Sequence, residues 1–419
     1  MILEPKIIDR RLVVLGAILI QVALGALYAW PVFTPTMQEA GWSKLDTQIT
    51  FSIGLATLAV AMVWAGRNIA RLGTRRLTIS SALVLGSGYI LAGLLGGTSF
   101  PVVTLCIGLI GGAGIGLGYM VPIAVGMRWF PDHRGMIAGI AVAGFGFGAM
   151  GWIKLAGEWG LLIDSYGIDR TFIFYGIAFT VLVLMGSTWM VMPPGGWHPT
   201  GWTPPPAEVT VARSEYTSRE MLRTIQFALL FLTFIVSGGA GLMSIGLMKL
   251  YPMEALEASG LSRVEASAIA GTALAVFFSI ANGMGRIIWG TISDRIGPRS
   301  ALLLMTFGQG VVLLLFTSMA DNEILLYCGA TLIGFNFGGN FALFPSITAN
   351  TFGPNNVGQN YPLVFLAYGV GGIIGPLLGG FLGDLGNFPL AFTLCGGACL
   401  GGTVLISLIR PLPPSQKSG

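Results

Sequence analysis

Arg286 is the residue of this sequence whose type and position most directly imply chemistry, because it lies in a long apolar stretch, 266–288. It stands eight positions before Asp294, which in a helix places it about 12 Å from the polar loop. A lone arginine at such a depth in hydrocarbon costs at least about 2.5 to 3.5 kcal/mol, so it should face the interior of a helix bundle and bind a counter-charge. None of the 18 Asp and Glu residues falls inside an apolar stretch. The sequence therefore predicts a carboxylate ligand, held by the planar guanidinium.

Other side chains within the apolar stretches are candidates for the same site. Asn282 lies one helical turn before Arg286 and is placed to orient the guanidinium or to donate to a ligand. Three tyrosines each offer a hydroxyl: Tyr28, Tyr119 and Tyr368. Four phenylalanines are candidates for an apolar wall against a short alkyl chain: Phe145, Phe337, Phe341 and Phe365. The alternatives are structural: Arg286 caps backbone carbonyls or reaches the interface, Asn282 links helices, and the phenylalanines face lipid.

The remaining reactive side chains argue against an enzyme. The two histidines, His133 and His198, lie in polar connections, and the four cysteines lie in apolar stretches without metal or redox spacing. We therefore expect no catalytic residue, no metal and no cofactor. The glycine runs at 111–116, 144–148 and 371–372 mimic nucleotide-binding loops, but inside apolar helices they let backbones approach closely instead.

The elements that position these residues follow from the composition: 54% of the 419 residues are hydrophobic and 10% are charged, against about 25% charged in a soluble chain. Stretches of about twenty apolar residues match the ~30 Å of hydrocarbon in a bilayer, and they are twice as long as barrel strands. The sequence predicts an all-α membrane protein. Its twelve expected spans are 12–33, 50–69, 77–95, 102–125, 136–153, 172–191, 226–247, 266–288, 301–319, 324–344, 362–381 and 391–408.

The distribution of positive charge predicts the orientation of the chain. Sixteen of the 22 Lys and Arg residues fall on the side of both termini, five fall on the opposite side, and Arg286 lies within a span. Positive residues collect in the cytoplasm, so both termini are expected there. The short tails and the lack of an organelle address are typical of a bacterial plasma-membrane protein. No cluster of Lys and Arg is dense enough to bind nucleic acid.

The sequence divides into two six-helix bundles, 1–193 and 224–419, joined by a cytoplasmic linker at 194–223 that is rich in proline and glycine. The two bundles repeat each other: the stretch Gly66 to Arg75 aligns with Gly290 to Arg299 at an offset of 224. Pro122 and Pro345 differ by 223. Parallel repeats of this kind are typical of transporters that bind substrate between the halves near the bilayer midplane. The spacing Thr217 to Glu220 predicts a capped short helix at the end of the linker.

At the second of these repeats the chain resembles the major facilitator superfamily, whose loop pattern Gly-x-x-x-Asp-Arg-x-Gly-x-Arg is complete at 290–299. The first copy has Ala70 in place of the acidic residue. The resemblance implies twelve helices around a central cavity lined by the spans that carry the three tyrosines. The positive cluster of Arg71, Arg75 and Arg76 is either a solvated loop on the positive side or, together with Asp294 and Arg295 of the second copy, a contact that stabilises one facing state.

Within that superfamily, the stretches 128–135 and 282–290 resemble the oxalate/formate antiporter family and the monocarboxylate transporters. Oxalate transport is associated with a second cation, a lysine in the eleventh span, where this chain has Tyr368. A single cation suits a monoanion. Animal monocarboxylate transporters carry an aspartate at the position of Asn282, so this chain lacks that proton-carrying group there.

These observations predict a secondary transporter of small monocarboxylates, such as lactate or pyruvate, that works by alternating access with proton coupling. The proton is then carried by the substrate or by a carboxylate at the outer ends of the seventh and eighth spans: Glu254, Glu257 or Glu265. The alternative is carboxylate exchange of the oxalate/formate type. The expected partners are a monocarboxylate, a proton and the lipid bilayer, with no nucleic acid and with the chain acting as a monomer. A channel is disfavoured, because one arginine in one half forms no charged ring. A scaffold is disfavoured, because such proteins usually carry an appended soluble domain and none is expected here.

Overall fold

The computed structural model describes residues 8–130, 134–157, 159–194, 197, 199, 215–353, 356–410 and 412. Within this part of the chain all regular structure is helical, and twelve helical segments are long and apolar enough to cross a membrane. The predicted fold class is therefore confirmed.

The first six spans are formed by α1 (Arg10–Leu24) with η1 (Gly25–Val32), α3 (Lys44–Leu72), α4 (Thr74–Leu95), α5 (Phe100–Val103) with η2 (Thr104–Gly111) and α6 (Gly112–Trp129), α7 (Arg134–Ala156), and α8 (Leu162–Ser187). A short helix, α2 (Thr34–Glu39), follows the first span. Several helices extend beyond the predicted spans. The largest difference is at α8, which begins ten residues before the expected start at 172 and contains a kink at Gly167.

The last six spans are formed by α10 (Ile225–Leu247), α12 (Arg263–Thr272) with η4 (Ala273–Phe278) and α13 (Ser279–Ile296), α14 (Pro298–Phe316), α15 (Glu323–Phe352), α16 (Val357–Asp384), and α17 (Phe388–Ser407). Two shorter helices, α9 (Ser218–Met221) and α11 (Leu250–Ala258), precede and follow α10. The predicted capped helix is confirmed in α9, because Thr217 and Glu220 form a capping box at its start.

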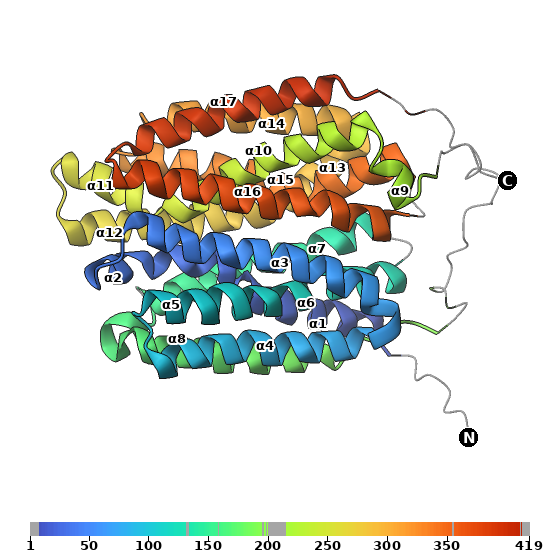
Figure 1. The fold of residues 1–419 in the computed structure, drawn as a ribbon, viewed down its shortest axis with the longest axis horizontal. Coiled ribbons are helices and arrows are strands. Elements are labelled where there is room, and N and C mark those ends of the chain that lie inside the picture. Colours follow the sequence, from blue (N-terminus) through green and yellow to red (C-terminus); the bar gives the residue numbers. More distant parts are fainter. Residues whose placement is uncertain are drawn as a thin grey trace.

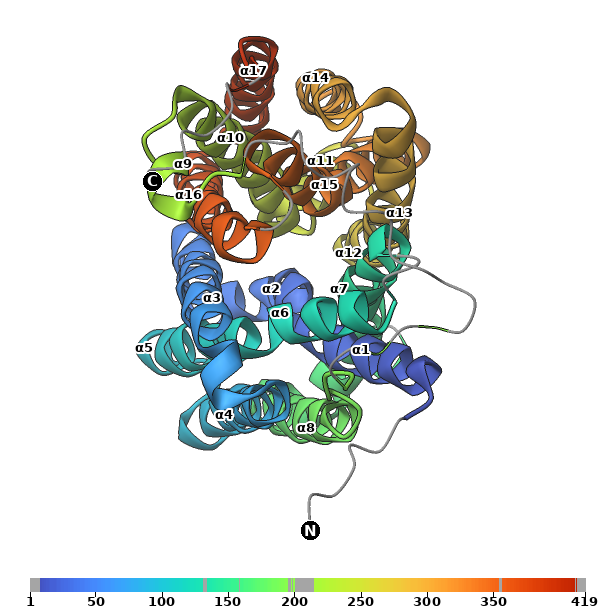
Figure 2. The same ribbon diagram turned by 90° about the vertical axis from the view of Figure 1, so that its right-hand side faces the viewer.

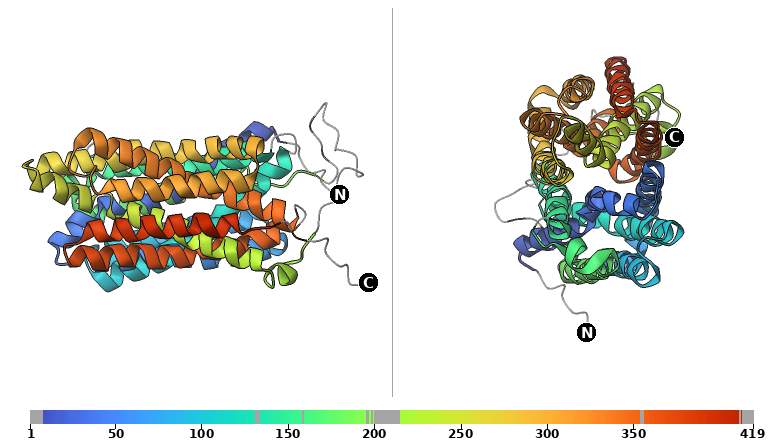
Figure 3. Two further views of the ribbon diagram at one scale, coloured as in Figure 1. Left: turned by 90° about the horizontal axis from the view of Figure 1, so that it is seen from above. Right: turned by 90° about the vertical axis from the view of Figure 1, so that its left-hand side faces the viewer.

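The spans run side by side along the long axis of the molecule (Figure 1 and the left view of Figure 3). The helix α1 begins and α17 ends at the same end of the bundle, near α9, whereas α2, α11 and α12 lie at the opposite end. Seen along the helices, α1 to α8 occupy one side and α10 to α17 the other (Figure 2). Most of the expected linker lies outside the described residues, so the boundaries of the two halves stay a prediction.

The internal repeat is visible in the backbone. The turn between α3 and α4 has Gly73 at φ 84° and ψ 150°, and the turn between α13 and α14 has Gly297 at φ 85° and ψ 149°. A positive φ of this size favours glycine, because a side chain would clash with the backbone. The two glycines are 224 residues apart, which matches the offset in the sequence.

Ion pairs join the two halves at the end of the bundle opposite the termini. Lys44 at the start of α3 pairs with Glu254 of α11 over 2.6 Å, and Arg263 of α12 pairs with Glu39 of α2 over 3.1 Å. Gln48 of α3 also donates to the carbonyl of Gly246 in α10. These polar contacts hold the two halves together at this end.

Candidate substrate-binding site

The Arg286 side chain lies inside the protein, on α13, with 1% of its surface exposed. Its Nε donates to Oδ1 of Asn282 over 3.2 Å, and its Nη1 donates to the carbonyl of Val142 in α7 over 2.9 Å. It therefore does not reach the interface. It does bond one backbone carbonyl, in agreement with the structural alternative in which Arg286 caps carbonyls. Its Nη2, however, has no hydrogen-bond partner among the described residues.

No carboxylate of the described residues lies within ion-pair distance of Arg286, since the ion pairs found there involve Lys44 and Arg263. The guanidinium lies instead against aromatic faces, 4.1 Å from the ring centre of Phe341 and 5.8 Å from that of Phe145. Such cation–π contacts stabilise a desolvated cation by about 2 kcal/mol, which is less than the several kcal/mol that burying an ion costs. The positive charge is left without a full counter-charge.

Three hydrogen-bond donors of this region are buried and lack a partner among the described residues: Nη2 of Arg286, Nδ2 of Asn282 and the hydroxyl of Tyr119. The Tyr119 side chain is a direct neighbour of Arg286. A buried donor without an acceptor costs about 1 to 3 kcal/mol. A carboxylate has two oxygens with about four acceptor positions, which is enough in number for three donors.

Two of the predicted tyrosines meet across the halves. The hydroxyls of Tyr28 and Tyr368 are 2.8 Å apart and form a hydrogen bond. Tyr28 lies in η1, where the first span tightens from an α-helix to a 3₁₀ helix that contains Pro31. A stretch of 3₁₀ helix within a longer helix often marks a functional hinge. The same segment packs against α7 so closely that a Cβ atom on Gly25 would lie 2.2 Å from the carbonyl oxygen of Phe145.

The four predicted phenylalanines form one aromatic cluster with the tyrosines. They come from both halves: Phe145 from α7, Phe337 and Phe341 from α15, and Phe365 from α16. The closest ring-centre distances are 4.8 Å between Tyr28 and Phe145, 4.9 Å between Phe365 and Tyr368, and 5.4 Å between Phe341 and Tyr368. All four are buried. The structure thus gathers the other eight predicted site residues into one cluster with Arg286, and what this cluster binds stays a prediction.

Sequence reasoning missed two contributors to this region. The Val142 carbonyl carries no signal in the sequence, because every residue has such a group. Tyr361 of α16 is buried, and its ring centre lies 5.8 Å from that of Phe365. The seven-residue spacing to Tyr368 places both on one helical face and was a usable signal.

The predicted loop residues lie far from this cluster. Asp294, Arg295, Arg71 and Arg75 are exposed at the end of the bundle where α1 begins, and within the described part of the chain none of them forms an ion pair. Their expected role in stabilising one facing state is not tested by these contacts and stays a prediction.

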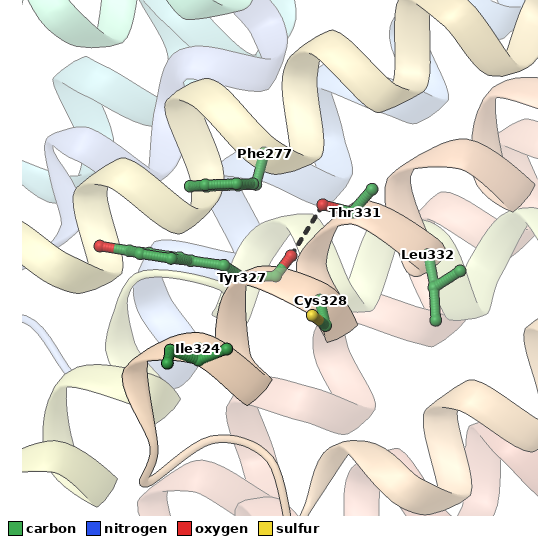
Figure 4. A pocket seen from close by; sticks show the side chains of 6 residues that line it. All are labelled: Phe277, Ile324, Tyr327, Cys328, Thr331 and Leu332. Atoms are coloured by element: carbon green, nitrogen blue, oxygen red, sulfur yellow. Dashed lines mark hydrogen bonds between the residues drawn. The ribbon is translucent and has the colours of Figure 1, made fainter.

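A hollow of about 480 Å³ opens elsewhere, between η4 and α15 (Figure 4). Its wall includes the stacked rings of Phe277 and Tyr327, 4.2 Å apart, together with Ile324 and Leu332, which are exposed. Thr331 donates its hydroxyl hydrogen to the Tyr327 carbonyl, so it offers little to a ligand (Figure 4). The lining contains no charged residue, and we assign it no part in recognising an anion.

Comparison with known proteins matches the Major Facilitator Superfamily model over residues 13–277 and 250–419. An uncharacterized MFS-type transporter of Escherichia coli, YhjX, is 29% identical, with 87% of this chain and 86% of that protein covered. The oxalate:formate antiporter of Oxalobacter formigenes is 26% identical, with 91% and 86% covered. Monocarboxylate transporter 13 of the rat is 26% identical, with 85% and 78% covered. The chain therefore belongs to the major facilitator superfamily, and it is a secondary transporter rather than an enzyme.

Proposed function

We propose that the protein carries a small monocarboxylate, such as lactate or pyruvate, across the membrane by alternating access, with Arg286 as the counter-charge of the anion. The observation that supports this most directly is the buried guanidinium of Arg286, which has no carboxylate partner among the described residues. Three donors there also lack an acceptor within that part of the chain: Nη2 of Arg286, Nδ2 of Asn282 and the hydroxyl of Tyr119. One carboxylate removes the charge imbalance and accepts from the donors together. Loading the site thereby lowers the cost of closing the two halves around it.

The surroundings of Arg286 favour a monoanion with a short apolar part. A dianion would need a second cation, and in place of one the cluster holds the neutral hydroxyl pair of Tyr28 and Tyr368. The phenylalanine rings offer an apolar wall to a methyl or ethyl group. Two of the similar proteins are named for carboxylates, the oxalate:formate antiporter and monocarboxylate transporter 13, and this supports the substrate class.

We also propose that both termini face the bacterial cytoplasm, because the positive residues favour that side. The end closed by Lys44 and Glu254 is then the outer end. The three candidate carboxylates for proton coupling lie there in different surroundings. Glu254 is paired with Lys44, Glu265 caps α12 through Ser262, and Oε1 of Glu257 is buried without a hydrogen-bond partner among the described residues. Because this carboxylate oxygen has no hydrogen-bond partner in that part of the chain, Glu257 is the first group to test.

The test is uptake of radiolabelled L-lactate and pyruvate into proteoliposomes, with and without an inward proton gradient. We expect accumulation driven by the gradient. The Arg286→Ala variant should lose transport while it stays folded, whereas Arg170→Ala, which removes an exposed arginine of α8, should keep it. Glu257→Gln should keep exchange of internal for external substrate but lose accumulation driven by the gradient.

Near-normal uptake by Arg286→Ala would overturn the assignment of the site. Transport that appears only after preloading with another carboxylate, and that ignores the pH gradient, would instead establish the antiporter alternative. In that outcome Arg286 keeps its role, and only the proton is removed from the mechanism.

A further inference from the structure

One turn of α7 contacts Arg286 and its neighbours on α13, in the opposite half, at three points. The Val142 carbonyl accepts from Nη1 of Arg286, and the ring of Phe145 lies 5.8 Å from the guanidinium carbon. The third point is Gly146, where a Cβ atom would lie 2.8 Å from Oδ1 of Asn282 and 3.0 Å from the backbone nitrogen of Gly283. Asn282 Oδ1 also accepts from Nε of Arg286. The helix α7 therefore supplies one of the two acceptors that hold the arginine, the Val142 carbonyl, and contacts the other, Asn282.

The contact is equally tight when it is viewed from α13. A Cβ atom on Gly283 would lie 2.7 Å from two ring carbons of Phe147 in α7. Contacts under 3.0 Å leave no room for a methyl group, so the two helices lie as close as glycine permits. Small residues allow helices in membranes to approach in this way. The approach is what brings the Val142 carbonyl, one turn before Gly146, within hydrogen-bond distance of Arg286.

The orientation of the guanidinium therefore depends on both halves. Asn282 holds Nε from the arginine's own helix, and Val142 holds Nη1 from the opposite half. With two of the three nitrogens fixed, the direction of Nη2, which has no partner in the described part of the chain, is determined. If α13 moved away from α7, Nη1 would lose its acceptor and the guanidinium would turn about the remaining bond.

We propose that Gly146 is a positioning residue for substrate recognition: its missing side chain lets α7 and α13 close far enough that Arg286 is fixed in the orientation that binds a carboxylate. This inference rests on the proposed function and deepens it. It means that the anion is bound tightly only when α7 and α13 are in close contact. Separation of the helices then weakens the anion's contact with Arg286, which favours release on whichever side opens.

The test compares Gly146→Ala with Gly151→Ala in detergent-purified protein. Gly151 lies on the same helix, and a Cβ atom there would meet nothing within 4 Å, so the control adds the same methyl group without a clash. Loss of one hydrogen bond to a charged group predicts that Gly146→Ala weakens L-lactate binding by about tenfold or more, measured by titration calorimetry. Thermal unfolding should stay near that of the control, because alanine favours helix more than glycine does.

A double-mutant comparison separates positioning from a general disturbance. In an Asn282→Ala background, the atom nearest to the added methyl group is gone, so Gly146→Ala should reduce binding by a clearly smaller factor than in the wild type. Equal factors in both backgrounds, or equal binding by Gly146→Ala and Gly151→Ala, would overturn the proposal.

A readout without substrate keeps the inference independent of the proposed function. Phenylglyoxal modifies accessible arginines, and modification at Arg286 is read by peptide mass spectrometry. Arg286 should stay unmodified in the wild type and in Gly151→Ala, because it is buried and bonded to Val142, and it should react in Gly146→Ala. If no monocarboxylate binds the wild type but this reactivity appears, the proposed substrate is wrong and the positioning role stands. Unchanged reactivity would overturn the positioning role.

Discussion

The carboxylate of Asp384, at the end of α16, accepts hydrogen bonds from the backbone amides of Lys44 and Leu45, at the start of α3 in the other half, over 2.8 and 3.0 Å. In the reverse direction, the Lys44 ammonium donates to the Gly383 carbonyl at the end of α16 over 3.2 Å and pairs with Glu254. Each charge lies at the helix end whose dipole it complements. The two halves are thus joined at this end by a reciprocal contact between two helix termini.

The first prediction is that Asp384→Asn shifts the protein toward states in which this end is open. Loss of one charge at an exposed helix end costs about 0.3 to 1 kcal/mol, so the open population should rise about two- to fivefold. The distance between spin labels at Ala40 and Ala258, exposed residues of opposite halves, measures this shift. The labels require a Cys328→Ser background, because Cys328 is exposed and the other three cysteines are buried.

The matched control for this shift is Asp321→Asn. Asp321 is an exposed carboxylate that precedes α15 at the same end of the bundle, and within the described part of the chain it takes part in no ion pair. It should leave the distance distribution unchanged. Equal distributions for Asp384→Asn and the wild type would show that the contact of Asp384 with α3 does not hold this end closed.

The second prediction concerns Arg286→Lys, which keeps the charge but loses the planar group. An ammonium has no rigid fork with which to bond Asn282 and Val142 while a third nitrogen faces the ligand. We expect kcat/KM for uptake to fall by at least about tenfold, the equivalent of one hydrogen bond to a charged group. Uptake within a factor of two of the wild type would mean that charge alone suffices and that the two anchors play no part.

The nine site residues could be selected from the sequence because each is a polar or aromatic side chain in a helical span defined by composition, and because the resemblance to the superfamily places the spans of the tyrosines around a central cavity. Arg286 stood out because a lone cation in an apolar span requires a partner. The contacts of α7 could not be selected in this way. The Val142 carbonyl is common to all residues, and the close approach at Gly146 depends on a helix of the other half, 136 residues away from Asn282 in the sequence. The contact between Lys44 and Asp384 could not be predicted from the sequence either, because it depends on how the two halves are arranged.

The third prediction is that Tyr368→Lys changes the preferred substrate from a monoanion to a dianion. The lysine replaces the hydroxyl that pairs with Tyr28 and places a second buried cation in the cluster that contains Arg286. A monocarboxylate then leaves one buried charge unpaired, which costs several kcal/mol. Inhibition of lactate uptake by oxalate should therefore increase. Tyr368→Phe removes the hydroxyl without adding charge, and it should not acquire oxalate sensitivity if charge is the cause.

The fourth prediction is that Gly241 of α10 sets the size of the apolar wall. A Cβ atom on Gly241 would lie 2.0 Å from Cδ2 of Phe337, whose ring centre is 5.8 Å from that of Tyr28 and 5.4 Å from that of Phe341. In Gly241→Ala the Phe337 ring has to move away from α10, and we expect the displaced ring to narrow the space for an alkyl group. Competition of lactate uptake by monocarboxylates of increasing chain length measures the effect. The longer acids should lose potency more than acetate does.

The control for Gly241 is Gly397→Ala in α17, where a Cβ atom would meet nothing within 4 Å. It should leave the whole series unchanged. If Gly241→Ala lowered the potency of every acid by the same factor, the methyl group would be acting through the stability or closure of the protein. A loss that grows with chain length instead shows that Phe337, whose ring fills the space beside Gly241, limits the chain length of the substrate.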